Sequence, residues 1–298
     1  LKPMAEMVSA FERDRVPFMG AVEVPDPHRF GVVKQDGEKL VSIIEKPSRP
    51  PSNLINGGFF GLGTEVFEHI RNTERSPRGE YEFTDTLNMM ASRTDVLVRR
   101  IRGEWMDVGY PWELLRANEF LMGRLERDIG GEVEEGAVLK GAVVVEEGAL
   151  VRSGSYIEGP AYISNGCDIG PNCYIRPFTC LGEGVRVGSS VEVKNSIVMR
   201  GTHIPHHNYV GDSVIGERCN FGAGTKVANL RFDDRTVRVT ANGRTMSTGR
   251  RKLGVVMGDD VKTGINAMIE PGTVIWERSV IGMGARARGS IGPSSRFF

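Results

Sequence analysis

Residues 157–187 read IEGPAYISNGCDIGPNCYIRPFTCLGEGVRV, and an aliphatic residue returns at every sixth position. The step of six runs from Val133 to Met199, where twelve consecutive positions are aliphatic or methionine. The residue four places after each of the first eleven is small or β-branched, from Ala137 to Ile197. This double column predicts a left-handed parallel β-helix, in which each hexad gives one short strand and one corner, and three hexads close a coil.

Glycine is abundant in the same part of the chain. The sequence holds 38 Gly among 298 residues, about twice the usual share, and 26 of them lie from Gly131 onward. We expect glycine and proline at the corners of the coils, because a tight corner needs backbone angles that most residues adopt poorly. The glycine excess therefore indicates a solenoid and not a flexible chain.

The repeat changes its step after Met199. We expect two five-residue steps and the next inward side chains at Ile204, Val210, Ile215, Phe221 and Val227. Residues 228–256 break the pattern and predict a loop thrown out from the coil, with a hairpin near Ala241-Asn242-Gly243. A long excursion from a regular solenoid is typically functional or interfacial. Steps of six return from Met257 to Ile281.

The first 123 residues have a different pattern, that of mixed strands and helices. Apolar runs predict strands at 17–24, 32–33, 40–44, 56–62 and 96–101, and helical spacing predicts helices at 1–11, 64–70, 85–91 and 111–125. Thr64 and Thr84 are expected as helix N-caps, and Pro111 as a first-turn residue. We therefore expect an α/β or α+β layer domain at 1–123, a linker at 124–130 and the β-helix at 131–298.

Charge and cysteine content exclude several classes of protein. Acidic and basic residues balance at 38 each, which argues against a nucleic-acid binder. No apolar run reaches the roughly 18 residues that span a bilayer, and no signal peptide opens the chain. Four Cys do not make a disulfide scaffold in a chain of this length, so we expect a cytoplasmic protein with no membrane partner. Cys167, Cys173 and Cys219 fall in the small-residue column and are expected to be buried.

Three of the five histidines lie within five residues, at His203, His206 and His207. Three interpretations are open at this point: a solvated surface cluster, a zinc site of a hydratase, or a general base. In the last case the histidine removes a proton from an amine or hydroxyl that attacks a thioester. Arg176 and Lys194 would then bind an anionic group of the substrate.

Three segments carry a resemblance to a known family: Val191-Glu-Val-Lys-Asn-Ser196, His206-His-Asn-Tyr-Val-Gly-Asp212 and Ile215-Gly-Glu-Arg-Cys-Asn-Phe-Gly-Ala-Gly-Thr225. They resemble the acetyltransferase domain of bifunctional sugar-1-phosphate nucleotidylyltransferase/acetyltransferases. Thr248–Gly254 and Gly258–Gly264 resemble its archaeal branch, and the likeness covers about residues 131–285. The resemblance implies acetyl transfer from acetyl-CoA to an amino-sugar 1-phosphate such as glucosamine-1-phosphate. It also implies a homotrimer, with acetyl-CoA in a cleft between adjacent β-helices.

The resemblance assigns a role to each matching position. His206 matches the catalytic base, and Asn229 matches an Asn that helps to place the amine and the acetyl group. The substrate and acetyl-CoA contacts match Arg176, Lys194 and Lys252 at the phosphate, Tyr209 and Asn220 at the sugar, and Ala223 at acetyl-CoA. Bacterial members carry Asn-Tyr where this chain has Asn229-Leu230, so one tyrosine contact is replaced and the sugar specificity stays open.

The first half resembles the sugar-binding part of a nucleotidylyltransferase domain, which implies a partial Rossmann-like mixed sheet. The matching motifs are Phe30–Val33, Ile44–Pro47, Asn56–Phe60, Glu80–Asp85 and Trp105–Gly109. By this match Gly31, Glu45, Lys46 and Asn56 line the sugar phosphate, and Asp107 is one of two carboxylates that hold Mg²⁺.

The family's phosphate-binding loop, Gly-x-Gly-Thr-[Arg/Lys], and the Gly-Asp pair that follows it do not occur before Phe30. We therefore expect about a hundred residues upstream of Leu1 in the parent enzyme, and no nucleotidylyl transfer by these 298 residues alone. An alternative keeps the nucleotidylyltransferase and gives the β-helix only a role in oligomerisation or regulation.

Overall fold

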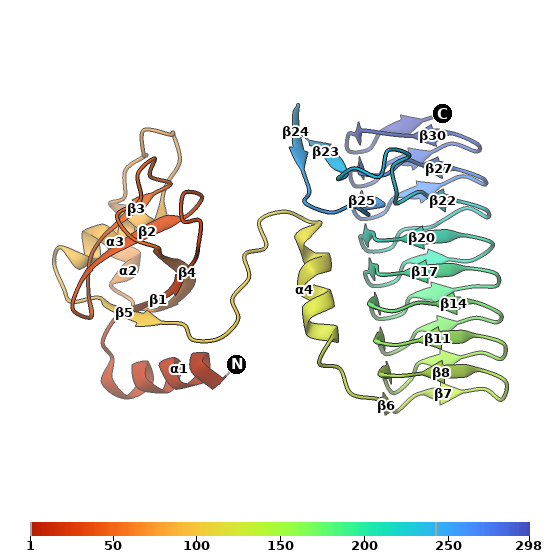
Figure 1. The fold of residues 1–298 in the computed structure, drawn as a ribbon, viewed down its shortest axis with the longest axis horizontal. Coiled ribbons are helices and arrows are strands. Elements are labelled where there is room, and N and C mark those ends of the chain that lie inside the picture. Colours follow the sequence, from red (N-terminus) through yellow and green to blue (C-terminus); the bar gives the residue numbers. More distant parts are fainter. Residues whose placement is uncertain (1, 242) are drawn as a thin grey trace. The chain divides into compact units, whose positions relative to one another are not determined.

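The computed structural model describes residues 2–241 and 243–298 and divides into two compact units, Leu1–Met106 and Asp107–Phe298. The second unit begins earlier than the predicted linker at 124–130. Helix α4 (Glu113–Met122) belongs to it, because the buried Trp112 and Leu115 pack against Val214 and Leu253 of the β-helix and its loop. Figure 1 shows α4 beside the stacked coils.

The first unit is built on one mixed sheet with the strand order β1-β4-β2-β3-β5. Strands β1 and β5 run parallel and the other pairs are antiparallel, and β5 also meets β3, so that the sheet closes on itself. Its elements are α1 (Lys2–Asp14), β1 (Phe18–Glu23), β2 (Gly31–Asp36), β3 (Lys39–Glu45), β4 (Leu54–Gly61), α2 (Val66–Arg71), α3 (Phe83–Ala91) and β5 (Leu97–Arg100).

The helix starts differ from the expectation in detail. Glu65 and Glu82 occupy the N-cap positions of α2 and α3, and neither makes a side-chain cap hydrogen bond. Thr84 is therefore inside the first turn of α3, where it is buried. The predicted start of the first helix at Leu1 lies outside the described residues, and the hairpin turn at Asn242 does so as well.

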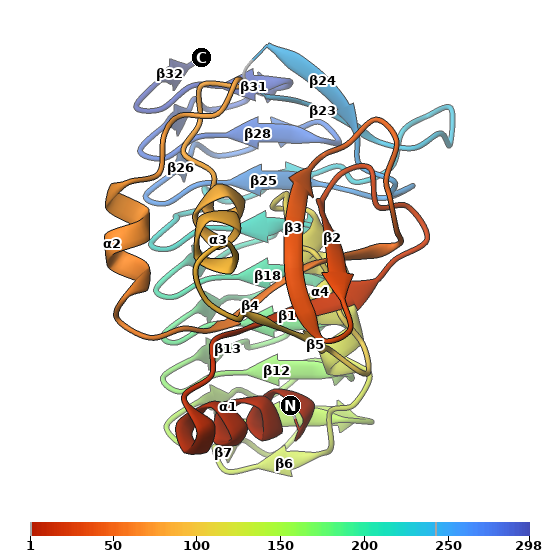
Figure 2. The ribbon, with the colours of Figure 1, turned by 90° about the vertical axis from the view of Figure 1, so that its left-hand side faces the viewer.

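The second unit is a left-handed parallel β-helix with three faces (Figures 1 and 2). The first face contains β7 (Glu132–Val133), β10 (Leu150–Val151), β13 (Asp168–Ile169), β16 (Arg186–Val187) and β19 (His203–Ile204), and continues through Asn220 to β26 (Lys262–Thr263), β29 (Val280–Ile281) and β32 (Arg296–Phe297). The second face contains β8 (Val138–Lys140), β11 (Tyr156–Glu158), β14 (Tyr174–Ile175), β17 (Glu192–Lys194), β20 (Tyr209–Gly211), β22 (Lys226–Val227), β27 (Met268–Ile269) and β30 (Arg286–Ala287). The third face contains β6 (Asp128–Ile129), β9 (Val143–Val145), β12 (Ala161–Ile163), β15 (Thr179–Leu181), β18 (Ile197–Val198), β21 (Val214–Ile215), β25 (Val255–Met257), β28 (Thr273–Ile275) and β31 (Ser290–Ile291).

The aliphatic column forms one continuous core, as the repeat predicts. One position is wrong: the inward residue after Val193 is Val198, which is 1% exposed and pairs with Leu181, and not Met199. The chain saves one residue at a tight corner where Asn195 has φ of 43°. Met199 instead packs outside the coil, in the cluster around Trp112.

The excursion at 228–256 contains the expected hairpin, formed by β23 (Arg238–Ala241) and β24 (Arg244–Ser247). Val237 and Val239 are buried in the cluster that also contains Trp112. The loop is tied to the coil at its base, because the Leu253 amide donates to the Asn229 carbonyl (3.0 Å) and the Gly254 amide to the Asp212 carbonyl (2.8 Å).

Candidate active site

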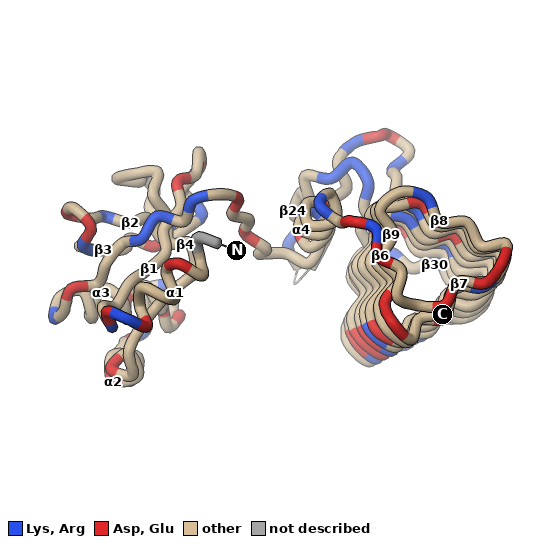
Figure 3. The backbone as a smooth tube through the Cα atoms, turned by 90° about the horizontal axis from the view of Figure 1, so that it is seen from below, with Lys and Arg blue, Asp and Glu red and all other residues tan. Residues whose placement is uncertain are grey.

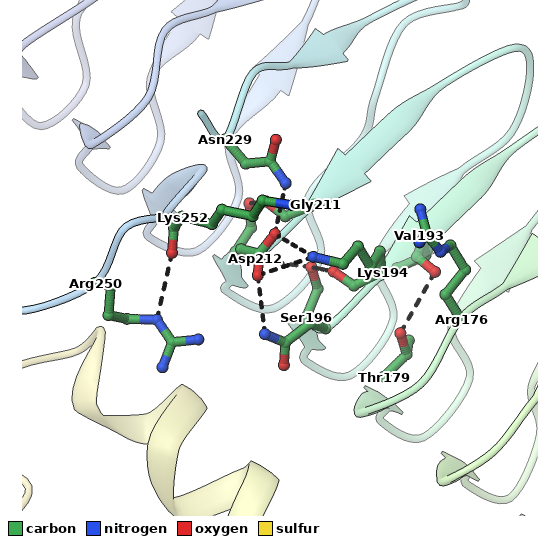
Figure 4. Close-up of polar contacts among 12 residues, drawn as sticks. Arg176, Thr179, Val193, Lys194, Ser196, Gly211, Asp212, Asn229, Arg250 and Lys252 are labelled. Atoms are coloured by element: carbon green, nitrogen blue, oxygen red, sulfur yellow. Dashed lines mark hydrogen bonds and ion pairs between the residues drawn. The ribbon is translucent and has the colours of Figure 1, made fainter. Parts of the chain in front are cut away.

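A buried carboxylate, that of Asp212, is the centre of a polar cluster on the β-helix. Its side chain is 3% exposed and accepts hydrogen bonds from Lys194 Nζ (2.9 Å), Asn195 Nδ2 (2.9 Å) and Asn229 Nδ2 (2.5 Å). Figure 4 shows Lys194, Asp212 and Asn229 converging from consecutive coils. A buried polar group is costly without hydrogen-bond partners, and here the Asp212 carboxylate has three, one of them in an ion pair with Lys194.

The corners of two successive coils bring these side chains together. Strand β17 pairs with β20 so that Lys194 lies beside Gly211, and the next residues, Asn195 and Asp212, both have positive φ, 43° and 50°. Such angles are unfavourable for residues other than glycine, and they occur here where the side chain is used. The absence of a side chain at Gly211 leaves room above Lys194 for Asn229 and Tyr209: a Cβ at Gly211 would meet both at 2.6 Å.

Two of the three predicted phosphate ligands, Arg176 and Lys194, are each already paired with a carboxylate. Arg176, one strand below Lys194, donates from Nη1 to Glu192 Oε1 (2.8 Å), and Lys194 is paired with Asp212. Lys252 comes from the base of the excursion loop, where it forms a β-bridge with Leu230. Figure 4 shows its side chain extended on the same side as Asp212 and Asn229. Among the described residues Lys252 forms no ion pair, so it supplies an uncompensated positive charge.

Tyr209 and Asn229 form the neutral part of the cluster. Asn229 Nδ2 donates a hydrogen bond to Tyr209 Oη (3.2 Å) and another to the Asp212 carboxylate. Burial raises the pKa of the Tyr209 phenol above its ordinary value, and the negative charge of Glu192 adds to this effect. The hydroxyl therefore remains protonated at neutral pH and is available as a hydrogen-bond donor.

His206 and Ala223 lie in corners of successive coils, and Asn220 lies on the first face. His206 is in the corner between β19 and β20, and its carbonyl accepts from the Gly224 amide (2.9 Å). Asn220 forms the bridge between His203 and Lys262 on the first face. His206 and Asn220 are exposed, and in the described part of the chain no hydrogen bond reaches the His206 ring. The structure thus gathers Arg176, Lys194, Tyr209, Asn229 and Lys252 in one cluster, places the exposed His206 and the half-buried Ala223 at corners before the second face, and places the exposed Asn220 on the first face.

The zinc interpretation of the histidines receives no support from the geometry. Across residues 2–241 and 243–298, no group of three or more His, Cys, Asp or Glu side chains is placed to hold a metal ion. His203 lies on β19, whereas His206 and His207 lie in the corner that follows it. The three rings do not converge on one point as zinc ligands must.

The predicted sugar-phosphate residues of the first unit gather at one end of its sheet. Gly31 pairs with Glu45, and a Cβ on Gly31 would come within 3.0 Å of Glu45 Oε2. Lys46 follows with φ of 46°, and Asn56 comes directly after Ile55, which pairs with Val32 next to Gly31. The side chain of Asn56 accepts from the Gly58 amide (2.9 Å).

Arg78 and Glu82 lie next to this group, and neither was predicted as a site residue from the sequence. Arg78 Nη2 lies 2.5 Å from Glu82 Oε1 and 3.8 Å from Glu45 Oε1. The hydrogen bond from Arg78 lowers the pKa of Glu82, so both remain charged at neutral pH. Nothing in the motif Glu80–Asp85 signals an arginine two residues before it.

The predicted magnesium ligand, Asp107, is exposed and is the first residue of the second unit. Mg²⁺ requires near-octahedral oxygen coordination. The described residues include no carboxylate cluster that would provide it. The described residues of this chain therefore do not fit a magnesium site by themselves.

Comparison with known proteins connects both units to one family. A family model described as Nucleotidyl transferase matches residues 2–124, and one described as GMPPB C-terminal domain matches residues 157–264. The chain is 48% identical over 261 residues to the Bifunctional protein GlmU of Methanocaldococcus jannaschii, which covers 87% of this chain and 64% of that protein. It is 47% identical over 273 residues to the Bifunctional sugar-1-phosphate nucleotidylyltransferase/acetyltransferase of Sulfurisphaera tokodaii, covering 91% and 68%. The chain belongs to the bifunctional sugar-1-phosphate nucleotidylyltransferase/acetyltransferase family.

Membership of the bifunctional sugar-1-phosphate nucleotidylyltransferase/acetyltransferase family confirms the prediction from the motifs. The chain spans 64% and 68% of the length of these two relatives. No helix in the described residues is long and apolar enough to cross a membrane. The four cysteines are unpaired, and Cys167, Cys173 and Cys219 are buried as expected.

For this member of the family, the structure adds four residues that the sequence analysis left out. They are Asp212, Asn195, Glu119 and Arg250. Asp212 could have been selected, because it ends the quoted segment His206–Asp212 and a buried Asp needs a cation. Glu119 could not, because it is 76 residues from Asn195 in sequence and reads as an ordinary helix residue.

Proposed function

We propose that the β-helix transfers an acetyl group from acetyl-CoA to the amine of an amino-sugar 1-phosphate such as glucosamine-1-phosphate. The observation that carries this proposal is the cluster around Asp212, with its buried charges and adjoining Lys252. A β-helix that served only oligomerisation would gain nothing from burying an ion pair, since an apolar pair of similar size is often at least as stable.

The charges of the cluster suit a phosphate monoester. Arg176 and Lys194 are neutralised by Glu192 and Asp212, and Lys252 adds a further positive charge at the edge of the same face. A phosphate can accept hydrogen bonds from all three cations while the carboxylates keep them in place. Tyr209 and Asn229 then offer neutral groups to the sugar hydroxyls and to the amine.

His206 is proposed as the general base. The nitrogen lone pair attacks the thioester carbonyl, the new C–N bond forms, the C–S bond breaks, and the thiolate of coenzyme A leaves. The imidazole accepts the proton that the amine loses, which the exposed ring of His206 is free to do. Asn229, fixed by Asp212 and Tyr209, is proposed to orient the amine and the acetyl group.

Acetyl-CoA and a second copy of the chain are proposed to share the face beside His206. A cleft of about 870 Å³ adjoins β22 and β27, with Leu230, Phe232 and Met268 in its lining. Phe232 is fully exposed, and the other two are at least 39% exposed. Apolar side chains exposed together in this way are typical of an interface, which supports assembly with a second copy of the chain. The assembly proposed is a homotrimer, and Ala223 and Asn220 are proposed to lie near the bound acetyl-CoA.

The experiment is a thiol-release assay with glucosamine-1-phosphate and acetyl-CoA. We expect the His206→Ala variant to lose at least about a hundredfold in kcat while acetyl-CoA binding, measured by calorimetry, stays within twofold. A matched control is His203→Ala, which removes the neighbouring ring on the first face. Equal turnover of the wild type and the His206 variant would refute the assignment.

The parent enzyme is proposed to add a nucleotidyl group to the sugar 1-phosphate at the first unit, where Gly31, Glu45, Lys46 and Asn56 adjoin. Magnesium, with Asp107 as one ligand, belongs to that parent site. The alternative, in which the β-helix only assembles the enzyme, predicts no thiol release at all. Four free cysteines support a reducing, cytoplasmic location.

A further inference from the structure

Helix α4 places one carboxylate against the cluster described above. Glu119 Oε1 accepts a hydrogen bond from Asn195 Nδ2 (2.9 Å) and another from Arg250 Nη2 (2.5 Å). Its side chain is 31% exposed, and that of Arg250 is 19% exposed. Figure 4 shows α4 running beside Arg250 at the edge of the cluster. One helix residue thus joins a coil corner to the excursion loop.

The first contact fixes the amide of Asn195. Its Nδ2 carries two hydrogens, and they go to Glu119 Oε1 and Asp212 Oδ1, both at 2.9 Å. Asn195 Oδ1 is buried and accepts no hydrogen bond within the described chain. The orientation of this amide is therefore set by the two carboxylates alone. Loss of Glu119 would free it to rotate away from Asp212.

The second contact fixes the base of the excursion loop. Arg250 Nε donates to the Lys252 carbonyl at 3.4 Å, and the Arg250 carbonyl accepts from the Val237 amide at 2.8 Å. Lys252 follows two residues later and bridges to Leu230. A charge-assisted pair between Glu119 and Arg250 therefore holds the segment that presents Lys252.

We propose that Glu119 is a positioning residue for the sugar-phosphate pocket. Through Asn195 it holds Asp212 against Lys194, and through Arg250 it holds the backbone of Lys252. Across the described residues, its hydrogen bonds go to Asn195 and Arg250 and to no residue proposed to bind substrate, so we expect it to act on binding of the sugar phosphate more than on the chemical step. The role in catalysis rests on the proposed acetyl transfer, but the effect on Lys194 does not.

The test compares Glu119→Ala and Glu119→Gln with the wild type, and uses Arg116→Gln as the control on the exposed side of α4. In the acetyl-transfer assay we expect Glu119→Ala to raise the KM for glucosamine-1-phosphate about tenfold and to change kcat and the KM for acetyl-CoA by less than about twofold. Glu119→Gln keeps an acceptor for Asn195 and loses the charge toward Arg250, so we expect an intermediate KM. Arg116→Gln should match the wild type.

A second measurement does not require turnover. Trinitrobenzenesulfonate labels free amines, and peptide mass spectrometry reports the labelling rate at Lys194. We expect this rate to rise about tenfold in Glu119→Ala, because Lys194 is then less tightly paired with Asp212. An unchanged rate at Lys194, or an equal rise in Arg116→Gln, would overturn the inference. If Lys194 is labelled faster in Glu119→Ala than in the wild type, but the wild type releases no thiol, the proposed function is refuted and the positioning role stands.

Discussion

The first coils of the β-helix, from β7 to β16, and the coils around Val193–Ile215 share one core but use their outward residues differently. From β7 to β16 the steps are uniform, and polar side chains pair across neighbouring coils at the surface, as Arg152 does with Asp168 (2.6 Å). Between Val193 and Ile215 two steps shorten to five, and Asn195, Ser196, Asp212 and Ser213 become buried. Viewed along the stack, charged residues line the outer corners (Figure 3). A shortened step turns a corner inward, and the cluster around Asp212 occupies two such corners.

Removal of one carboxylate from each region should give the largest difference in the free energy of unfolding. We expect Asp212→Ala to destabilise the protein by about 3 kcal/mol, because it leaves the ammonium of Lys194 and two amides without their acceptor. Asp168→Ala removes a pair whose side chains are 38% and 35% exposed, and should cost about 1 kcal/mol or less. Urea unfolding at pH 7 measures both. Similar midpoints for the two variants would mean that the shortened steps bury no real charge.

Backbone angles at the corners offer a smaller contrast. Gly166 has φ of 69° and open space for a side chain, since the atom nearest to an added Cβ would be at 3.7 Å. We therefore expect Gly166→Ala to cost about 1–2 kcal/mol through backbone strain alone. Asn195→Gly relieves strain at φ of 43° and loses two hydrogen bonds, so the net change should stay under about 1 kcal/mol.

Thermal or urea unfolding of Gly166→Ala and Asn195→Gly tests this contrast, and the acetyl-transfer assay measures the effect of each variant on activity. Gly166→Ala should leave turnover unchanged, whereas Asn195→Gly should raise the KM for the sugar phosphate. If Asn195→Gly leaves the KM for the sugar phosphate unchanged and Gly166→Ala alters turnover, the corner at Asn195 depends on its backbone conformation and not on its side chain.

The smallest expected effect concerns thiols, which the two regions bury alike. Burial raises the pKa of Cys167 to about 12 and of Cys219 to about 11, from 9.0. Between pH 9 and 11 the unfolded chain has lost these protons and the native one has kept them. The contribution of the thiols to native stability is therefore constant below pH 9 and falls above it. Urea unfolding at pH 8 and pH 10.5 should show a shallower fall for Cys167→Ala than for the wild type. Parallel slopes would count against a buried neutral thiol.

Much of the β-helix was open to prediction from sequence, because its core repeats. Positions such as Ile157 and Ile175 recur at a fixed period and are fully buried. The exception is the inward residue after Val193, which was predicted as Met199 and is Val198. Both residues are apolar, and periodicity alone does not locate a shortened corner. The hairpin was also predictable, from the turn-like sequence Ala241-Asn242-Gly243 at the junction of its two strands.

The candidate site was predictable only where it repeats a family motif. Arg176, Lys194, Tyr209, Asn229 and Lys252 were found by resemblance, and the structure places them in one cluster. Glu119 and Arg250 were missed because their contact joins residues 131 positions apart, and no local pattern encodes a contact of that range. The compact units divide before α4 and not after it, because α4 is assigned by what Trp112 and Leu115 touch.

The first coil of the stack, formed by β6, β7 and β8, ends the three faces on one side. Strands in such a position present backbone N–H and C=O groups to any other strand that approaches. In the described chain this coil carries more acidic than basic side chains, namely Asp128, Glu132, Glu134 and Glu135 against Arg127 and Lys140. Two such ends repel each other, so pairing of this end of the solenoid with the same end of a second molecule is disfavoured.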